Sequence, residues 1–272
     1  MKTVLNIMEA AESSIKNDEC INWEKTINII KMLENENQLL QQYIDSSNLN
    51  ANVKLQDKFG SNQKGWYNWV FNKLKFKKNY KVLEIGCGNG ALWFKNINSL
   101  KKSVNITLTD ICQDMIDDAN YNLRDYDHKF NFKRIDPSDM PFKDESFDVV
   151  IANHVLFYMK DLDKVLFEIK RVLKTEGQFY CSTIDDKHMK ELEEIMIGFS
   201  SNMKISEKKL CENFGLNNGE CILKDYFSDI QTYSYKDKLI VNDTKAILEY
   251  VYTIPGNILE IVDTKKKNLK LY

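Results

Sequence analysis

The chain has 272 residues, of which 43% are hydrophobic, and its 38 basic and 40 acidic side chains give a formal net charge of −2. The length exceeds the roughly 100–200 residues usual for one domain, so we expect one large domain or a domain with an appendage. The ordinary apolar fraction argues against a disordered chain, and the near-neutral charge argues against a dedicated nucleic-acid binder, which would carry a basic surplus.

Targeting signals and cysteine usage indicate the compartment. No stretch approaches the roughly 20 consecutive apolar residues of a membrane span, and the apolar run in the first residues, MKTVLNIMEAAE, is too short for a signal peptide. The six cysteines include no Cys-x-x-Cys pair and are accompanied by only three histidines, so we expect neither a disulfide framework nor a metal site. These features predict a cytoplasmic protein that does not enter a membrane.

Residues 1–48 are predicted to form a helical N-terminal extension. Apolar residues with helical spacing near the start are Val4, Met8, Ala11 and Ile15, and a similar spacing resumes from Trp23 to Ile44. Two interpretations remain open. The second helix can form a short coiled coil with Asn37 setting the register, which would give a homodimer, or it can pack against its own domain in a monomer.

From Tyr80 onward, predicted strands alternate with predicted helices. The strands are Lys81–Ile85, Val104–Thr109, Phe130–Ile135, Phe147–Ala152 and Gln178–Thr183. The helices lie near Ala91–Leu100, Gln113–Tyr126 and Leu162–Leu173. Repeated βα units predict a Rossmann-like, doubly wound, mostly parallel sheet with helices on both faces. Ligands bind such sheets at the carboxyl ends of the strands.

The last part of the chain is predicted to complete a seven-stranded sheet. Tyr226–Tyr235 and Lys238–Val241 have the composition of a closing pair of strands. A helical insertion covering about residues 187–225 precedes them. Residues 49–272 would then form one domain.

A glycine-rich turn follows the first strand. Gly86, Gly88 and Ala91 fit the dinucleotide-binding fingerprint, but that pattern alone is weak. Glu84 lies two residues before the first glycine, where its carboxylate would repel a pyrophosphate. S-adenosylmethionine (SAM) carries an ammonium and a sulfonium instead, so an acid at this position favours SAM over a dinucleotide.

Two further acids end the next two strands. Asp110 follows the second predicted strand, where a carboxylate can accept both ribose hydroxyls of a nucleoside. Asp136 follows the third, where it can accept from the exocyclic amine of an adenine. Either acid alone can be a helix cap or a loop residue, but three acids at successive strand ends point to one ligand.

With these motifs the chain resembles the class I SAM-dependent methyltransferases of the methyltransferase-11 or UbiE-like group, over about Leu49 to Ile254. The matching motifs are Glu84-Ile-Gly-Cys-Gly-Asn-Gly90, Thr109-Asp110-Ile111 with Met115, Asp136 with Met140–Asp148, Ala152-Asn153-His154, and Arg171–Lys174 with Gly177. The resemblance implies SAM as the cofactor and S-adenosylhomocysteine as its product. The residues that it implies for cofactor binding are Glu84, Gly86, Cys87, Gly88, Asp110, Ile111, Met115, Asp136, Pro137, Ser138 and Asn153.

One position departs from the family pattern. Family members often bind adenine with the backbone N–H that follows the adenine-binding acid, and here that residue is Pro137, which has no N–H. Ser138 can supply its own N–H or hydroxyl instead. We therefore expect a weakened or rearranged adenine contact.

His154 is the best-placed titratable residue for catalysis, with Tyr158 behind it. It can equally be a histidine that only packs or hydrogen-bonds at a strand end. Trp66, Tyr67 and Trp69 precede the first strand, on a segment that resembles a lid over the methionyl end of SAM. Aromatic residues at this spacing can equally belong to the core.

The leading functional hypothesis is methyl transfer from SAM to a small-molecule acceptor by in-line displacement. One alternative is a methyltransferase for RNA or another macromolecule, against which stand the charge balance and the absence of an Asn-Pro-Pro-Tyr motif at Asn153-His154-Val155-Leu156. Another is an inactive SAM-binding partner or sensor that assembles through its N-terminal helices. A nicotinamide-dependent reductase is disfavoured by Glu84. The sequence does not identify the acceptor.

Overall fold

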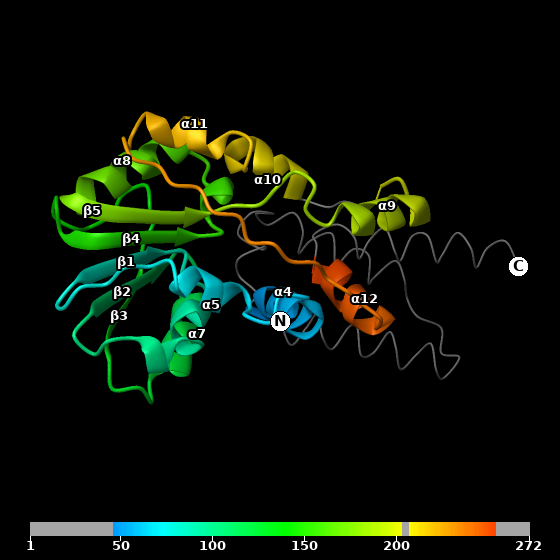
Figure 1. Cartoon of the computed structure of the whole chain (residues 1–272), viewed down its shortest axis with the longest axis horizontal. Coiled ribbons are helices and arrows are strands. Elements are labelled where there is room, and N and C mark those ends of the chain that lie inside the picture. The colour runs from blue at the N-terminus through cyan, green and yellow to red at the C-terminus, as the bar shows by residue number, and fades with distance from the viewer. Residues whose placement is uncertain (1–45, 203–206, 254–272) are drawn as a thin grey trace, which may run out of the picture.

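The computed structural model describes residues 46–202 and 207–253. The predicted N-terminal helices before residue 46 lie outside these residues. A five-stranded parallel sheet forms the centre of the molecule (Figure 1). Its strands are β1 (Lys81–Ile85), β2 (Asn105–Asp110), β3 (Lys129–Arg134), β4 (Phe147–Asn153) and β5 (Leu173–Ser182). Each of the five coincides with a predicted strand to within a few residues at its ends, apart from β5, which begins five residues earlier.

The strand order is β3-β2-β1-β4-β5, and every neighbouring pair is parallel. The chain moves outward from β1 to β3 and then returns to the other side of β1, so the order reverses between β1 and β4. In the register of the central strands, Glu84 lies opposite Leu108 of β2 and Ile151 of β4. The end of β1 is therefore the topological switch point, where ligands of such sheets bind. The predicted Rossmann-like fold is confirmed.

Helices cover both faces of the sheet. One face packs against α5 (Trp66–Phe71), α6 (Ala91–Phe94) and α7 (Gln113–Leu123). The other packs against α8 (Leu162–Val172), α10 (Glu207–Phe214) and α11 (Gly219–Lys224). Two 3-10 turns span Ile97–Ser99 and Leu156–Tyr158. Within the described ranges, no helix has the length and apolar character that a bilayer span requires.

The alternation of side chains along β1 explains how the two faces are filled. Val82 packs with the first set of helices, whereas Leu83 and Ile85 pack with the second. All three are almost fully buried, and each such side chain contributes about 1.5–3 kcal/mol relative to exposure. By the same alternation Glu84 shares the face of Val82, so its carboxylate points towards α6.

A third, smaller apolar cluster lies beyond the carboxyl ends of the strands. It joins α4 (Ser46–Phe59), α9 (Lys190–Phe199) and α12 (Thr244–Thr253), which lie together to the right of the sheet in Figure 1. Its buried members are Leu55, Phe59, Met196, Tyr250 and Val251. We call these three helices, with residues 228–241, the cap.

The prediction of two closing strands is wrong. Residues 228–241 form an irregular segment that runs from α11 past the ends of β4 and β5 to α12 (Figure 1). Their backbone groups pair with the turn after α4 instead of with the sheet, because Ser61 N donates to Lys238 O at 2.8 Å and Ile240 N donates to Phe59 O at 2.9 Å. One antiparallel bridge, between Gly60 and Leu239, is the remnant of strand pairing here. The sheet of the described residues thus has five strands rather than seven.

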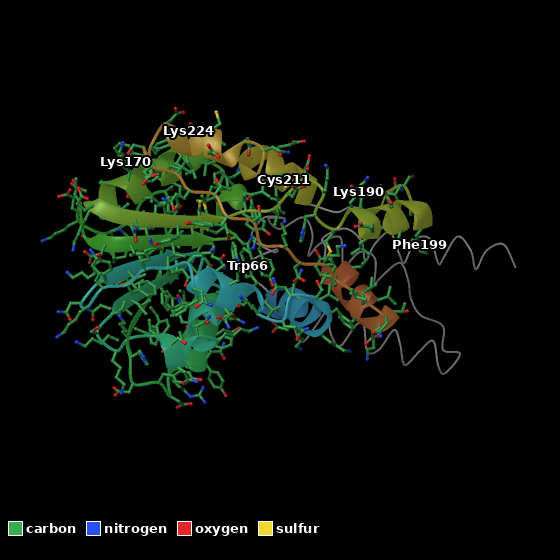
Figure 2. All side chains as sticks on the ribbon, in the orientation of Figure 1. Trp66, Lys170, Lys190, Phe199, Cys211 and Lys224 are labelled. Carbon is green, nitrogen blue, oxygen red and sulfur yellow. The ribbon has the colours of Figure 1, made fainter. Side chains whose placement is uncertain are left out.

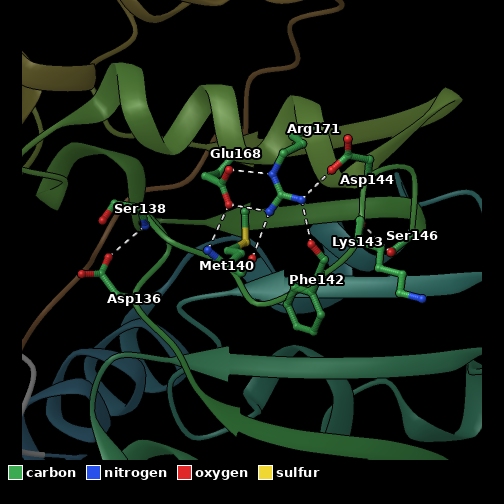
Figure 3. A network of polar contacts seen from close by, with 9 residues as sticks. All are labelled: Asp136, Ser138, Met140, Phe142, Lys143, Asp144, Ser146, Glu168 and Arg171. Carbon is green, nitrogen blue, oxygen red and sulfur yellow. Dashed lines mark hydrogen bonds and ion pairs between the residues drawn. The ribbon is translucent and has the colours of Figure 1, made fainter.

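Arg171 of α8 holds the connection between β3 and β4 (Figure 3). Its guanidinium donates to the carbonyl oxygens of Phe142 and Met140 at 2.7 and 2.9 Å, and it pairs with Asp144 at 2.8 Å and Glu168 at 2.7 Å. Hydrogen bonds to both carboxylates raise the pKa of Arg171 well above its usual range, so the ion pairs persist at any working pH. This network fixes the loop that follows Asp136.

Candidate active site

A cavity of about 1960 Å³ extends from the carboxyl ends of the strands, where they meet the cap, along β5 as far as its start at Leu173. Trp66, at the start of α5, lies between the sheet and α4 in Figure 2. The cavity wall contains most of the residues singled out from the sequence, namely Trp66, Tyr67, Trp69, Glu84, Gly86, Cys87, Gly88, Asp110, Met115, Asn153, His154 and Tyr158. The fold therefore brings together residues that are up to 92 positions apart in the sequence (from Trp66 to Tyr158).

The turn after β1 requires glycine at its first position. Gly86 has φ 66°, and a Cβ there would lie 2.4 Å from Val155 Cγ2. Gly88 and Gly90 also have positive φ, at 53° and 79°. The backbone N–H of Cys87 donates to Thr109 O at 2.9 Å, which fastens the turn to the end of β2. Gly86, Cys87 and Gly88 of this turn line the cavity.

Glu84 is a buried acid in the cavity wall, with 2% of its surface exposed. Its Oε2 accepts a hydrogen bond from the indole Nε1 of Trp93 at 2.5 Å. Burial raises the pKa of Glu84 to about 8; the Trp93 hydrogen bond opposes this rise and the nearby Asp110 adds to it. A buried carboxyl group with this pKa would be stabilised in its charged form by a cation placed beside it.

Asp110 ends β2 and is 5% exposed. Its two carboxylate oxygens accept backbone N–H groups from Gly88 and Cys112, each at 3.0 Å. Burial raises the pKa of Asp110, and hydrogen bonds from the backbone of Cys112, Gly88 and Ile111 offset only part of this rise. The carboxylate is thus fixed in orientation at the cavity wall.

Asn153 and His154 follow each other at the end of β4. Ser182, at the end of β5, donates its hydroxyl to Asn153 Oδ1 at 2.6 Å and accepts the backbone N–H of His154 at 2.9 Å. His154 has φ 54°, an uncommon conformation for a residue with a side chain. Burial lowers the pKa of His154 to about 4, with a smaller contribution from His188. The imidazole is therefore neutral at pH 7.

The aromatic residues of α5 form a cluster at the cavity wall. The ring of Trp66 stacks on Trp69 with centroids 5.5 Å apart, lies 4.5 Å from the ring of His154, and meets Tyr235 edge-on at 5.2 Å. The indole Nε1 of Trp66 is buried and has no hydrogen-bond partner among the described residues. Burial raises the pKa of Tyr67, and the charges of Glu84 and Asp57 raise it further. The cluster combines apolar ring faces with buried donors.

Four predicted cofactor residues, Ile111, Asp136, Pro137 and Ser138, are not part of this wall. Ile111 is 39% exposed and Asp136 is exposed, both beyond the ends of β2 and β3. The N–H of Ser138 donates to Asp136 Oδ1 at 2.8 Å, as Figure 3 shows. That N–H is therefore already engaged, which leaves the hydroxyl of Ser138 for a ligand.

Three residues of the site were not found by sequence reasoning. Trp93 donates to Glu84, Tyr235 completes the aromatic cluster, and Asp237 lies in the cavity wall two residues later. Trp93 follows Glu84 by nine residues on the helix after the glycine turn, and this spacing is the signal that could have identified it. Tyr235 and Asp237 gave no signal, because Tyr235 was predicted to end a strand of the sheet and Asp237 to lie in the connection to the next strand.

Comparison with known proteins identifies related chains. A family described as a methyltransferase domain matches residues 76–250, more than half of the chain. The demethylmenaquinone methyltransferase of Lactobacillus johnsonii is 35% identical over 118 residues, which are 43% of this chain and 48% of that protein. The malonyl-[acyl-carrier protein] O-methyltransferase of Legionella pneumophila is 25% identical over 179 residues, which are 65% of this chain and 58% of that protein.

Among solved structures, a SAM-dependent methyltransferase from Aquifex aeolicus matches with a TM-score of 0.40 and 17% identity, over 48% of this chain and 68% of that one. The chain spans about half of the length of the two curated relatives described above. The family match over residues 76–250 contains the glycine turn and the strand-end acids.

Proposed function

The chain belongs to the methyltransferase domain family, as its resemblance to class I SAM-dependent methyltransferases predicted, and from this premise we propose that it transfers a methyl group from SAM to a small-molecule acceptor. The observation that carries the proposal is the buried acid at the switch point. Glu84 lies in the cavity wall with a pKa of about 8, a position that a bound cation would stabilise.

The residues of this chain fit SAM. Its methionyl ammonium would pair with Glu84, and the glycine turn from Gly86 through Cys87 to Gly88 leaves room for the backbone to approach it. Asp110, whose carboxylate is held in place by the backbone N–H groups of Gly88 and Cys112, would accept the ribose hydroxyls.

The adenine would extend from Met115, which is buried, over the exposed side chain of Ile111 towards Asp136. Because Pro137 has no N–H and the N–H of Ser138 donates to Asp136, the ring would contact the carboxylate of Asp136 and the hydroxyl of Ser138. We therefore propose an adenine site that is more open to solvent than the methionyl site.

Bound SAM supplies a methyl group on a sulfonium, which an acceptor atom attacks in line. Asn153, held by Ser182, would orient the methionyl end beside that methyl group. The rings of Trp66, Tyr67 and Trp69 would exclude water and attract the sulfonium by cation–π interaction. The buried Nε1 of Trp66 would donate to an oxygen of the acceptor.

His154 is our candidate for a catalytic residue. Its left-handed backbone and its contact with Trp66 orient the imidazole at the cavity, where strained conformations are frequently functional. Because its pKa is about 4, the neutral ring can accept a hydrogen bond from an acceptor hydroxyl but is a weak base. It would therefore position the acceptor and take up its proton only as the methyl group is transferred.

The aromatic wall favours a small apolar acceptor, in keeping with the demethylmenaquinone named for one relative. The acyl-carrier-protein substrate named for the other relative keeps a protein-bound acceptor open as an alternative. The described cysteines form no disulfide with one another, which supports a reducing compartment such as the cytoplasm.

The test is a screen of metabolite fractions with methyl-labelled SAM and the purified chain. We expect label in an apolar fraction, with His154→Ala lowering turnover at least tenfold while SAM affinity changes less than about threefold. Turnover by His154→Ala equal to wild type between pH 6 and 9 would remove this residue from the mechanism. If label appeared only in RNA or protein, the acceptor would be a macromolecule and the proposal of a small-molecule acceptor would be wrong.

A further inference from the structure

Segment 228–241 of the cap is fastened to the turn between α4 and α5 at one place. Backbone pairs join Ser61 to Lys238 and Phe59 to Ile240. The side-chain amide of Asn62 donates to Lys236 O at 3.0 Å. Parts of the chain about 175 residues apart therefore meet directly beside the cavity.

The carboxylate of Asp237 is the centre of this fastening. Its Oδ1 accepts three hydrogen bonds, from the hydroxyl of Ser61 at 3.0 Å, from the backbone N–H of Asn62 at 2.8 Å and from its neighbour Lys238 N at 2.8 Å. Hydrogen bonds to an ionised acceptor are roughly twice as strong as those between neutral groups. Two of the three cross from the segment to the turn, so this one oxygen ties the two parts together.

Gly60 makes room for the carboxylate. A Cβ at this position would lie 2.9 Å from Asp237 Oδ2 and 2.6 Å from the carbonyl oxygen of Gln56. Its φ lies outside the left-handed range, so space rather than backbone conformation requires glycine here. The turn is thus shaped to receive Asp237.

Tyr235 links the fastening to the aromatic cluster. Its ring lies 5.2 Å from Trp66 and 5.3 Å from Trp69, centroid to centroid. Tyr235 precedes Asp237 by two residues in the same segment. Burial, the negative charge of Asp237 and hydrogen bonding to it raise the pKa of Tyr235 to about 12. Asp237 therefore holds both the turn that leads into α5 and the ring that packs against α5.

We propose that Asp237 is a positioning residue that closes the cavity by holding Tyr235 against Trp66 and Trp69. The inference rests on the proposed function, since it takes this cavity as the SAM site. Release of Asp237 frees segment 228–241 from the turn and removes Tyr235 from the wall. The product then leaves faster, while the sheet and the glycine turn stay intact.

The experiment measures the dissociation rate of S-adenosylhomocysteine by stopped-flow tryptophan fluorescence with the full chain. We expect Asp237→Ala to raise the rate about tenfold, since it removes several hydrogen bonds to a charged group. Asp237→Asn keeps an oxygen at Oδ1 and should stay within about threefold of wild type. Tyr235→Ala leaves the Oδ1 bonds in place but removes the ring, so it should match Asp237→Ala.

Lys58→Ala is the matched control. This variant removes an exposed ion pair between Lys58 Nζ and Asp243 Oδ2, which are 2.9 Å apart. The pair also joins α4 to the C-terminal part of the chain, but it does not contact the aromatic cluster. We expect the wild-type rate from it, and thermal unfolding checks that every variant is folded. A wild-type rate in Asp237→Ala, or equal rates in the Asn and Ala variants, would overturn the inference alone. Failure of the wild-type chain to bind S-adenosylhomocysteine would contradict the proposed function and, with it, this inference.

Discussion

The sheet with its covering helices and the cap are built in different ways. At the centre of the sheet, Val82, Leu83 and Val149 have no exposed surface, and the buried acids Glu84 and Asp110 accept hydrogen bonds. In the cap, Ile195 of α9 is 68% exposed and Ile240 of segment 228–241 is 70% exposed. The sheet layer contains two large apolar clusters, and the cap contains one small cluster.

This difference separates stability from ligand closure. Apolar burial is the dominant stabilising term in folding, so most of the free energy of unfolding comes from the sheet layer. The cap contributes walls of the cavity. It is attached to the sheet layer largely through the turn after α4 and through surface ion pairs such as Asp57–Lys95, which joins α4 to the end of α6. The ligand site lies between the well-packed sheet layer and the lightly attached cap, an arrangement suited to binding and release.

The sharpest contrast compares a glycine of each region. Gly86→Ala puts a Cβ 2.4 Å from Val155 Cγ2 at a positive φ, and we expect it to lower the free energy of unfolding by about 3–5 kcal/mol. Gly198 lies within α9 with nothing within 4 Å of an added Cβ. Gly198→Ala should be neutral or stabilising by up to about 1 kcal/mol, because alanine favours the helix.

Urea denaturation measures both variants. Equal losses of stability from Gly86→Ala and Gly198→Ala would contradict the distinction between the sheet layer and the cap. A large loss from Gly198→Ala alone would mean that the cap is a principal source of stability.

A smaller effect is expected from Arg171, which fixes the loop between β3 and β4. Arg171→Ala removes its contacts to Met140, Phe142, Asp144 and Glu168, and should cost about 2–3 kcal/mol of unfolding free energy. Lysine cannot form the same forked contacts, so Arg171→Lys should recover less than half of this loss.

Arg124→Ala is the control, because this arginine is exposed and bonds to Tyr121 O within its own helix turn. It should cost less than about 1 kcal/mol. If Arg171→Ala were equally mild in urea denaturation, the loop after Asp136 would not depend on the network of Figure 3.

The strands of the sheet layer could be predicted from the sequence because local residue patterns determine them. Lys81–Ile85 is an apolar strand ending in a glycine turn, and the structure has β1 at those residues. The acids Glu84 and Asp110 could be placed at strand ends, and from there in one site, because parallel strands end at the same edge of a sheet. For Glu84 and Asp110, the position at the end of a predicted strand was sufficient to assign them to the site.

The structure of the cap could not be predicted in the same way. Lys238–Val241 has the apolar, β-branched composition of a strand, but its backbone pairs with a turn about 175 residues away instead of with the sheet. Such pairings between distant segments leave no periodic pattern in the sequence.

The most direct test of the account concerns Glu84, by titration calorimetry of SAM binding at pH 7 in buffers of different ionisation enthalpy. With a pKa of about 8 in the free protein, Glu84 is protonated at pH 7 and must ionise to pair with an ammonium, so affinity should rise with pH up to about 8.

We predict the release of about 0.9 proton per SAM bound by the wild-type chain. Glu84→Gln should release none and bind roughly 10- to 150-fold more weakly, the value of about 1.5–3 kcal/mol for hydrogen bonds to charged groups. Binding without proton release, or wild-type affinity in Glu84→Gln, would contradict the assignment of Glu84 to the methionyl ammonium.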